Sequence, residues 1–95
     1  MNIKKEYTIL IIYDISNDKT RNKIFHILSG YGHNIQKSAF LCILTNLVYK
    51  NMLLALNKIR IEETDSICIY KLFKFKSVII GKQLNNLFDK NYIIL

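Results

Sequence analysis

The stretch IQKSAFLCIL, residues 35–44, decides the fold, because it can form either one strand or two. Its ten residues are enough for one long strand, or for two short strands joined by a tight bend near Leu41 or Cys42. The number of strands formed here determines how the elements before and after it are ordered.

Before this stretch, the sequence predicts a strand and then a helix. Residues 7–13 form a strand that is apolar on both faces. The helix that follows has apolar residues with i, i+3, i+4 and i+7 spacing. Asn17 or Asp18 can cap its start, and Gly30 or Gly32 ends it. The apolar positions of this helix are Ile24, Ile27, Leu28 and Tyr31.

After this stretch, Thr45 can cap a second helix, whose apolar stripe is marked by Leu47, Leu54 and Ile61. Three further segments have strand character, namely residues 65–73, residues 76–80 and the tail 84–95, which ends in YIIL. One strand in 35–44 gives the order β-α-β-α-β-β. Two strands give the βαββαβ order of a ferredoxin-like α+β sandwich.

In either arrangement, two helices cover only one face of the sheet. The strand at 7–13 is nevertheless apolar on both faces. A second copy of the chain, related by a two-fold axis, is the economical way to cover the other face. We therefore expect a homodimer joined through or beside the sheets.

Length and charge limit the function further. The 95 residues form one domain, and the formal charge of +7 favours anionic partners such as nucleic acid. AT-rich codons, which supply Ile, Asn and Lys, are an alternative explanation of this basicity.

No segment approaches the roughly 20 apolar residues of a membrane span. Cys42 and Cys68 are too few and too far apart for a disulfide framework, so we expect a cytoplasmic protein with reduced thiols and no membrane partner.

Asp14, at the end of the first strand, is the candidate metal ligand and catalytic residue. One carboxylate is a weak metal site, but two brought together across a dimer axis can share a Mg²⁺ ion. Such an ion could activate water or stabilise charge on a phosphodiester. The alternative is that Asp14 is a turn residue that binds the backbone of Ser16 or Asn17.

Basic side chains follow Asp14 closely along the chain. Arg21 and Lys23 lie in the first turns of the predicted helix, where they can meet a phosphate held near the metal. Solvated surface charges are the alternative. Along the strands, the basic surface continues through Lys37, Lys71, Lys74 and Lys76. Contacts of this kind give salt-dependent binding that is largely indifferent to base sequence.

The order of these segments resembles the family of CRISPR-associated protein two, the small partner of the CRISPR integrase. The similarity rests on YDIS, a helix that carries RNK, Gly32, IQKSAF, the helix capped by Thr45, and DSICIYKL. It extends from residue 7 to about residue 81. Arg21 and Lys23 match the basic pair of the first helix in that family. Ser38 and Phe40 match its QKSxF segment, whereas Asn34 stands where many relatives carry an Arg.

The resemblance implies a single ferredoxin-like domain over residues 1–95, with a core at about 7–81 and a tail at 82–95. It implies that the tail adds a strand, which can be exchanged with the partner subunit or packed on it. It also implies that Asp14 of both chains binds one shared Mg²⁺ at the axis of a homodimer. Arg21, Lys23 and Lys37 would then contact nucleic acid, with Tyr13, Ser38 and Phe40 in supporting positions.

Two functions of different classes are compatible with this family. Its members act as metal-dependent nucleases on RNA or DNA, and also as scaffolds that hold the integrase around a captured DNA fragment. The resemblance implies an adaptation protein that is mainly a scaffold, with the CRISPR integrase and DNA, and with RNA as a further substrate, among its partners. The alternative is a toxin-type messenger RNA endoribonuclease of the same fold.

Overall fold

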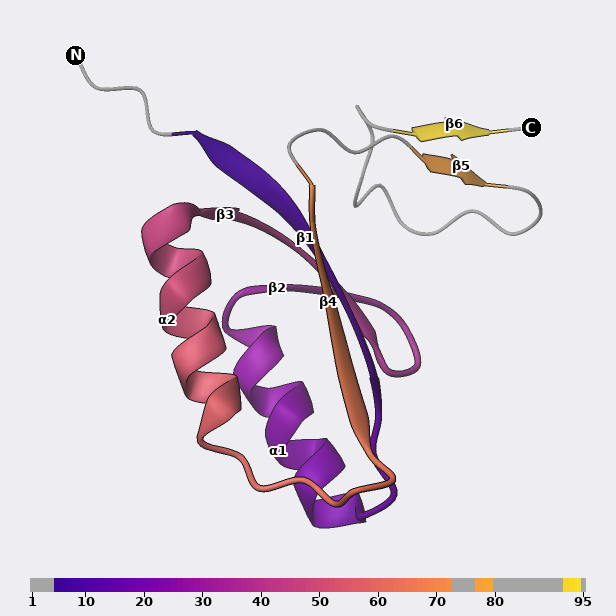
Figure 1. Cartoon of the computed structure of the whole chain (residues 1–95). Coiled ribbons are helices and arrows are strands. Elements are labelled where there is room, and N and C mark those ends of the chain that lie inside the picture. The colour runs from indigo at the N-terminus through magenta and orange to yellow at the C-terminus, as the bar shows by residue number, and fades with distance from the viewer. Residues whose placement is uncertain (1–4, 73–76, 80–91, 95) are drawn as a thin grey trace.

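The computed structural model describes residues 5–72, 77–79 and 92–94. Its main unit is a four-stranded antiparallel sheet with strand order β2-β3-β1-β4 and two helices, α1 and α2, on one face (Figure 1). This is the predicted βαββαβ ferredoxin-like α+β fold. The elements of this unit are β1 (Glu6–Asp14), α1 (Asp18–Ser29), β2 (Gly32–Gln36), β3 (Ala39–Thr45), α2 (Asn46–Asn57) and β4 (Ser66–Leu72).

Two short strands near the C-terminus form a separate parallel pair. They are β5 (Ser77–Ile79) and β6 (Tyr92–Ile94). The prediction that residues 76–80 and the tail each supply a strand is confirmed, although these strands pair with each other and not with the main sheet. Residues 82–91 and 95 of the predicted tail lie outside the described residues.

The stretch at 35–44 contains a bend, so the prediction of two strands is confirmed, but the predicted position of the bend is wrong. The turn lies at Lys37 and Ser38, while Leu41 and Cys42 are buried in the middle of β3. Ser38 takes a positive φ of 66°, and Asn34 donates hydrogen bonds to the Gln36 and Ala39 carbonyls at 2.8 and 3.0 Å. The polar residues Lys37 and Ser38 form the turn, because burial in β3 favours the apolar residues that follow them.

The core lies between the sheet and the helices. Alternate residues of β1 point toward the helices, and Ile9 and Ile11 are fully buried there. From the other elements, the core receives Ile24, Leu28, Phe40, Cys42, Leu44, Met52 and Leu56. Asn17 caps α1 by accepting a hydrogen bond from the Thr20 amide at 3.0 Å, and Gly30 ends it. Thr45 caps α2, as predicted.

The predicted apolar stripe of α2 is not the side that the helix buries. Met52 and Leu56 are the residues that α2 buries, whereas Leu47 and Leu54 are 66% and 62% exposed. The helix ends at Asn57, so Ile61 is not part of it. Apolar residues occur on several sides of α2, and for that reason periodicity alone could not identify the side that faces the sheet.

The sheet face opposite the helices carries exposed apolar side chains, as the apolar character of both faces of β1 predicted. Ile12 is 44%, Ile43 52% and Tyr70 51% exposed. These three side chains lie on the same face of the sheet. Thr8, Leu10 and Ile12 alternate along β1 and share one face, and Ile43 pairs with Thr8 while Tyr70 pairs with Leu10. We call this the open face. Within the described residues, no helix is long and apolar enough to cross a membrane.

Candidate metal and nucleic-acid site

Asp14 is the last residue of β1 and lies on the open face, two residues after Ile12. Its side chain is exposed, and it pairs in register with Ser66 of β4. Among the described residues, its carboxylate has no hydrogen-bond or salt-bridge partner. The carboxylate therefore has its oxygens available for a cation.

The residues on either side of Asp14 are fixed in the core. Tyr13 and Ile15 are only 3% and 4% exposed. The Tyr13 ring stacks on Phe40 with centroids 6.4 Å apart, and the Tyr13 amide donates to the Ser38 carbonyl at 3.0 Å. Tyr13, Ser38 and Phe40 thus position the end of β1. Burial raises the pKa of the Tyr13 hydroxyl, and the nearby Arg21 charge partly opposes this shift.

Asp65, which the sequence analysis assigned only to a strand, holds the chain just after Asp14. Its Oδ1 accepts hydrogen bonds from the Ser16 amide and hydroxyl at 3.0 and 3.1 Å, and its Oδ2 accepts from the Glu62 amide at 3.0 Å. These backbone hydrogen bonds lower the pKa of the Asp65 carboxyl. The alternative role considered for Asp14, binding the backbone of Ser16, is filled by Asp65.

Arg21 reaches back from α1 to the end of β1. Its Nη1 donates to the Ile15 carbonyl at 3.0 Å, and its Nη2 pairs with Asp18. The side chain is 35% exposed, so part of the guanidinium still meets solvent. Arg21 therefore braces the backbone beside Asp14, and only its remaining N–H groups are available to a phosphate.

The structure separates the other two predicted basic residues. Lys37 is exposed in the turn between β2 and β3, next to Ser38 and hence close to the end of β1. Lys23 is also exposed, but it lines a groove of about 740 Å³ between α1 and the segment that follows α2. Lys58 and Arg60 line the same groove. Lys37 and Arg21 thus share one end of the sheet with Asp14, and Lys23 belongs to the helical side.

In the part of the chain that the structure describes, Asp14 is the carboxylate at this end that is available to a cation, because Asp18 is paired with Arg21. Groups of three or more metal-binding side chains do not occur within residues 5–72, 77–79 and 92–94. Asp65 accepts hydrogen bonds on both oxygens, so Asp14 is the one with free oxygens. A carboxylate oxygen is the kind of ligand that Mg²⁺ prefers, and Mg²⁺ is commonly held by one or two carboxylates with water or phosphate oxygens. Asp14 therefore fits such an ion as one ligand of a site completed from elsewhere.

Comparisons with known proteins agree with this fold. The family model for CRISPR associated protein Cas2 matches residues 7–76. A CRISPR-associated endoribonuclease Cas2 of Chloroflexus aurantiacus is 44% identical over 64 residues, which cover 66% of this chain and 69% of the relative. One from a Synechocystis strain is 36% identical over 66 residues, with coverages of 70% and 72%.

The comparison with solved structures also finds a Cas2 protein. The crystal structure of Streptococcus pyogenes Cas2 at pH 6.5 is similar with a TM-score of 0.60 and 28% identity, covering 66% of this chain and 82% of that one. The family model spans most of the chain, and its match begins at β1 and includes the whole ferredoxin-like unit. The chain belongs to the CRISPR-associated protein Cas2 family.

Proposed function

We propose that this protein acts in CRISPR adaptation as a dimeric nucleic-acid-binding scaffold for the integrase, with a magnesium-dependent phosphodiesterase centre at Asp14. The observation that carries the proposal is the position of Asp14 on the open face, in line with the exposed Ile12. A second copy that covers this apolar face brings its own Asp14 into the same interface. Two carboxylates in one interface repel, and a shared divalent cation removes that repulsion.

The residues around Asp14 have separable roles in this proposal. Tyr13 and Ile15 hold the backbone of Asp14 in the core, so that the carboxylate is presented at a fixed place. Lys37 and the free N–H groups of Arg21 bind the phosphate of the nucleic acid and orient it. A bound Mg²⁺ supplies Lewis-acid stabilisation of charge on the phosphodiester.

The scaffold is the main role in this proposal, and cleavage is secondary. The two relatives described above are named CRISPR-associated endoribonucleases, which supports a nuclease activity on RNA. The same names favour a CRISPR function over the toxin-type messenger RNA endoribonuclease. The two roles make different demands on Asp14, because only cleavage needs its carboxylate.

The test compares the wild type with Asp14→Asn for magnesium-dependent cleavage of single-stranded RNA and duplex DNA. Asparagine keeps the size of the side chain and removes its charge. We expect cleavage to fall by at least about a hundredfold, the scale observed when one electrostatic group is removed from a catalytic site. Glu63→Gln is the matched control, since Glu63 is an exposed acid to which the proposal gives no role. Unchanged cleavage by Asp14→Asn contradicts the catalytic part of the proposal.

The scaffold part has its own readout, which is spacer acquisition in cells that carry the integrase. We expect Asp14→Asn to support acquisition at the wild-type level, whereas Lys37→Glu impairs it by reversing a charge that contacts nucleic acid. Both side chains are exposed, so neither change disturbs the core. Full acquisition by Lys37→Glu, or loss of acquisition by Asp14→Asn, contradicts this division of roles.

A further inference from the structure

Helix α2 has a second apolar stripe that the sheet does not cover. Leu47 and Leu54 are seven residues apart and thus lie on the same side of the helix. They are 66% and 62% exposed, although α2 already buries Met52 and Leu56 on its other side. Ile61, a further seven residues along and beyond the end of the helix, is 38% exposed. Apolar residues in such a row are typical of a surface that packs on another element.

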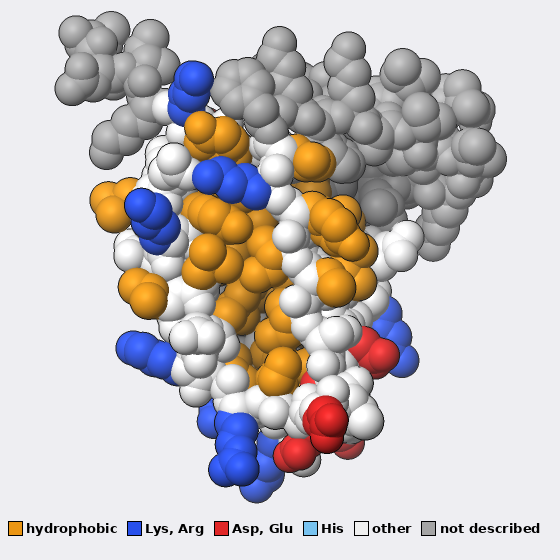
Figure 2. Space-filling view, in the orientation of Figure 1, with side chains coloured by type: hydrophobic (Ala, Val, Ile, Leu, Met, Phe, Trp, Pro, Cys, Tyr) orange, Lys and Arg blue, Asp and Glu red, His pale blue; other side chains and the backbone are white. Residues whose placement is uncertain are grey.

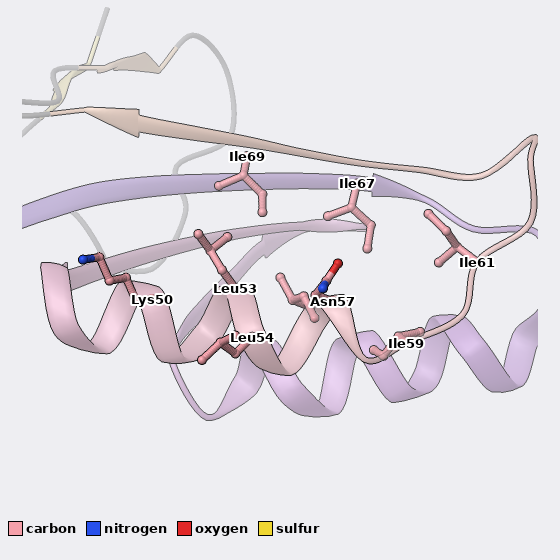
Figure 3. A pocket seen from close by; sticks show the side chains of 9 residues that line it. Lys50, Leu53, Leu54, Asn57, Ile59, Ile61, Ile67 and Ile69 are labelled. Atoms are coloured by element: carbon pink, nitrogen blue, oxygen red, sulfur yellow. The ribbon is translucent and has the colours of Figure 1, made fainter.

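This stripe borders a groove between α2 and β4, which we call the α2–β4 groove. Its volume is about 630 Å³. Figure 3 shows Ile67 and Ile69 of β4 pointing toward α2, with Leu53 facing them from the helix. Figure 2 shows the same region as a continuous hydrophobic strip on this side of the molecule. The groove is lined by Lys50, Leu53, Leu54, Leu56, Asn57, Ile59, Ile61, Ile67 and Ile69.

The charge along the α2–β4 groove is uneven. Lys50 lines the end near the start of α2, and α2 contains no Asp or Glu. Toward the opposite end, Lys58, Arg60, Glu62 and Glu63 are all exposed, and their formal charges cancel. Lys50 is thus the one charged side chain among the described residues that line the groove. An occupant of the groove is therefore favoured when its acidic end lies beside Lys50.

We propose that the α2–β4 groove binds an amphipathic helix of a partner protein, with an apolar side that packs on Leu54 and Ile61 and acidic residues beside Lys50. Helix-in-groove recognition uses apolar anchors spaced three, four and seven residues apart. In the α2–β4 groove, Leu53 and Leu54 of α2 and Ile61, which follows the helix, supply apolar surface for such anchors. This site is separate from the Asp14 end of the open face and needs no nucleic acid.

A second copy of this chain fits the α2–β4 groove less well. An antiparallel α2 from a second copy, with the two Leu54 side chains opposite each other, places Lys50 of one chain opposite Lys58 of the other. Both lysines are exposed, and like charges in such positions destabilise helix pairs. The formal charge of +7 on each chain adds to this repulsion. Nucleic acid also fits poorly, because most of the groove wall is apolar.

The test uses three labelled synthetic peptides and fluorescence anisotropy at physiological salt. The first is a helix with leucine at the first and fourth positions of each seven-residue repeat and glutamate on both flanks. The second carries lysine in place of glutamate, and the third has the composition of the first in scrambled order. We expect the wild type to bind the first peptide at least tenfold more tightly than either of the others.

Variants of the full chain locate the binding. Leu54→Glu should weaken binding of the first peptide at least tenfold, and Lys50→Glu should reverse the preference between glutamate and lysine peptides. Val48→Glu, which changes an exposed apolar residue of α2 that does not line the groove, is the matched control and should bind as the wild type does. Because Leu54 and Lys50 are exposed, circular dichroism should show all three variants folded.

Several outcomes overturn the proposal. Equal binding of the scrambled and ordered peptides shows attraction by net charge alone. Wild-type affinity in Leu54→Glu places the peptide elsewhere. A change of oligomeric state in Leu54→Glu identifies the occupant as a second copy, and displacement of the bound peptide by a DNA duplex identifies it as nucleic acid.

Discussion

At the scale of single residues, Asp65 joins the loop before β4 to the chain that leaves β1. Its carboxyl pKa is lowered by the hydrogen bonds from the Ser16 and Glu62 amides. A carboxyl with a lowered pKa in the folded state stabilises the fold fully above its ordinary pKa of 3.8. That stabilisation is lost as the pH falls below 3.8 and through the lower pKa of the folded state.

We therefore predict that Asp65→Asn lowers the thermal midpoint at pH 7 and flattens its dependence on pH below about 4. Asparagine offers one oxygen where Asp65 uses two, so either the Ser16 or the Glu62 amide loses its acceptor. The measurement is thermal unfolding by circular dichroism across pH 3 to 7. Glu63→Gln is the control. An equal shift of the thermal midpoint in both variants would contradict the stabilising role assigned to Asp65.

The YDIS motif shows how far single residues could be predicted. An apolar strand that ends in one carboxylate indicated the exposed position of Asp14, because alternation along the strand is a local property. The contact between Asp65 and Ser16 joins residues 49 apart in the chain, and no local pattern reveals it. Arg21 was predicted as a phosphate contact, but its bonds to Ile15 and Asp18 depend on the turn of the chain after β1.

At the scale of elements, the turn between β2 and β3 depends on Ser38, whose φ of 66° lies in the left-handed region. Glycine adopts this conformation without the steric cost that a side chain incurs. We predict that Ser38→Gly stabilises the protein by up to about 1 kcal/mol and leaves cleavage unchanged. Denaturant unfolding and a cleavage assay measure the two effects. Loss of cleavage in a stable Ser38→Gly variant would assign a direct role to the hydroxyl.

The pairing of β2 with β3 depends on Gly32 because the two backbones approach closely there. A Cβ at Gly32 would lie 2.8 Å from the Cα of Cys42 and would also clash with the Leu41 carbonyl. We predict that Gly32→Ala destabilises the fold by about 1–3 kcal/mol, the usual cost of overpacking. The measurement is denaturant unfolding, with Gly30→Ala as the control, since the nearest atom to a Cβ at Gly30 is 3.4 Å away. Equal losses in both variants would contradict this explanation.

The order of the elements was largely predictable, and the errors at this scale have one cause. The turn at Lys37 and Ser38 was predicted too late in the sequence. The apolar stripe of α2 was predicted at Leu47, Leu54 and Ile61, whereas the helix buries Met52 and Leu56. In both places, apolar residues extend beyond what one buried face requires. Periodicity identifies the type of element, but the choice between two apolar faces is made by packing against the rest of the chain.

At the scale of the whole molecule, the two sheet faces have different roles. One is covered by α1 and α2, and the open face exposes Ile12, Ile43 and Tyr70 and carries Asp14 at one end. Exposed apolar residues gathered on one face are typical of a protein interface. The proposed dimer and the proposed metal site therefore depend on the same surface, and a change that separates the chains should also abolish cleavage.

We predict that Ile12→Asp converts a dimer into a monomer, because it introduces a charge into the apolar face that the second copy would cover. Analytical ultracentrifugation measures the mass, and the cleavage assay measures activity on the same samples. Leu47→Asp is the matched control, since Leu47 is at least as exposed but lies on the helical side. In dilution series of the wild type, cleavage should decrease in proportion to the dimer fraction. A monomeric Ile12→Asp that still cleaves nucleic acid would show that one Asp14 is sufficient, and the metal site would then be complete within a single chain.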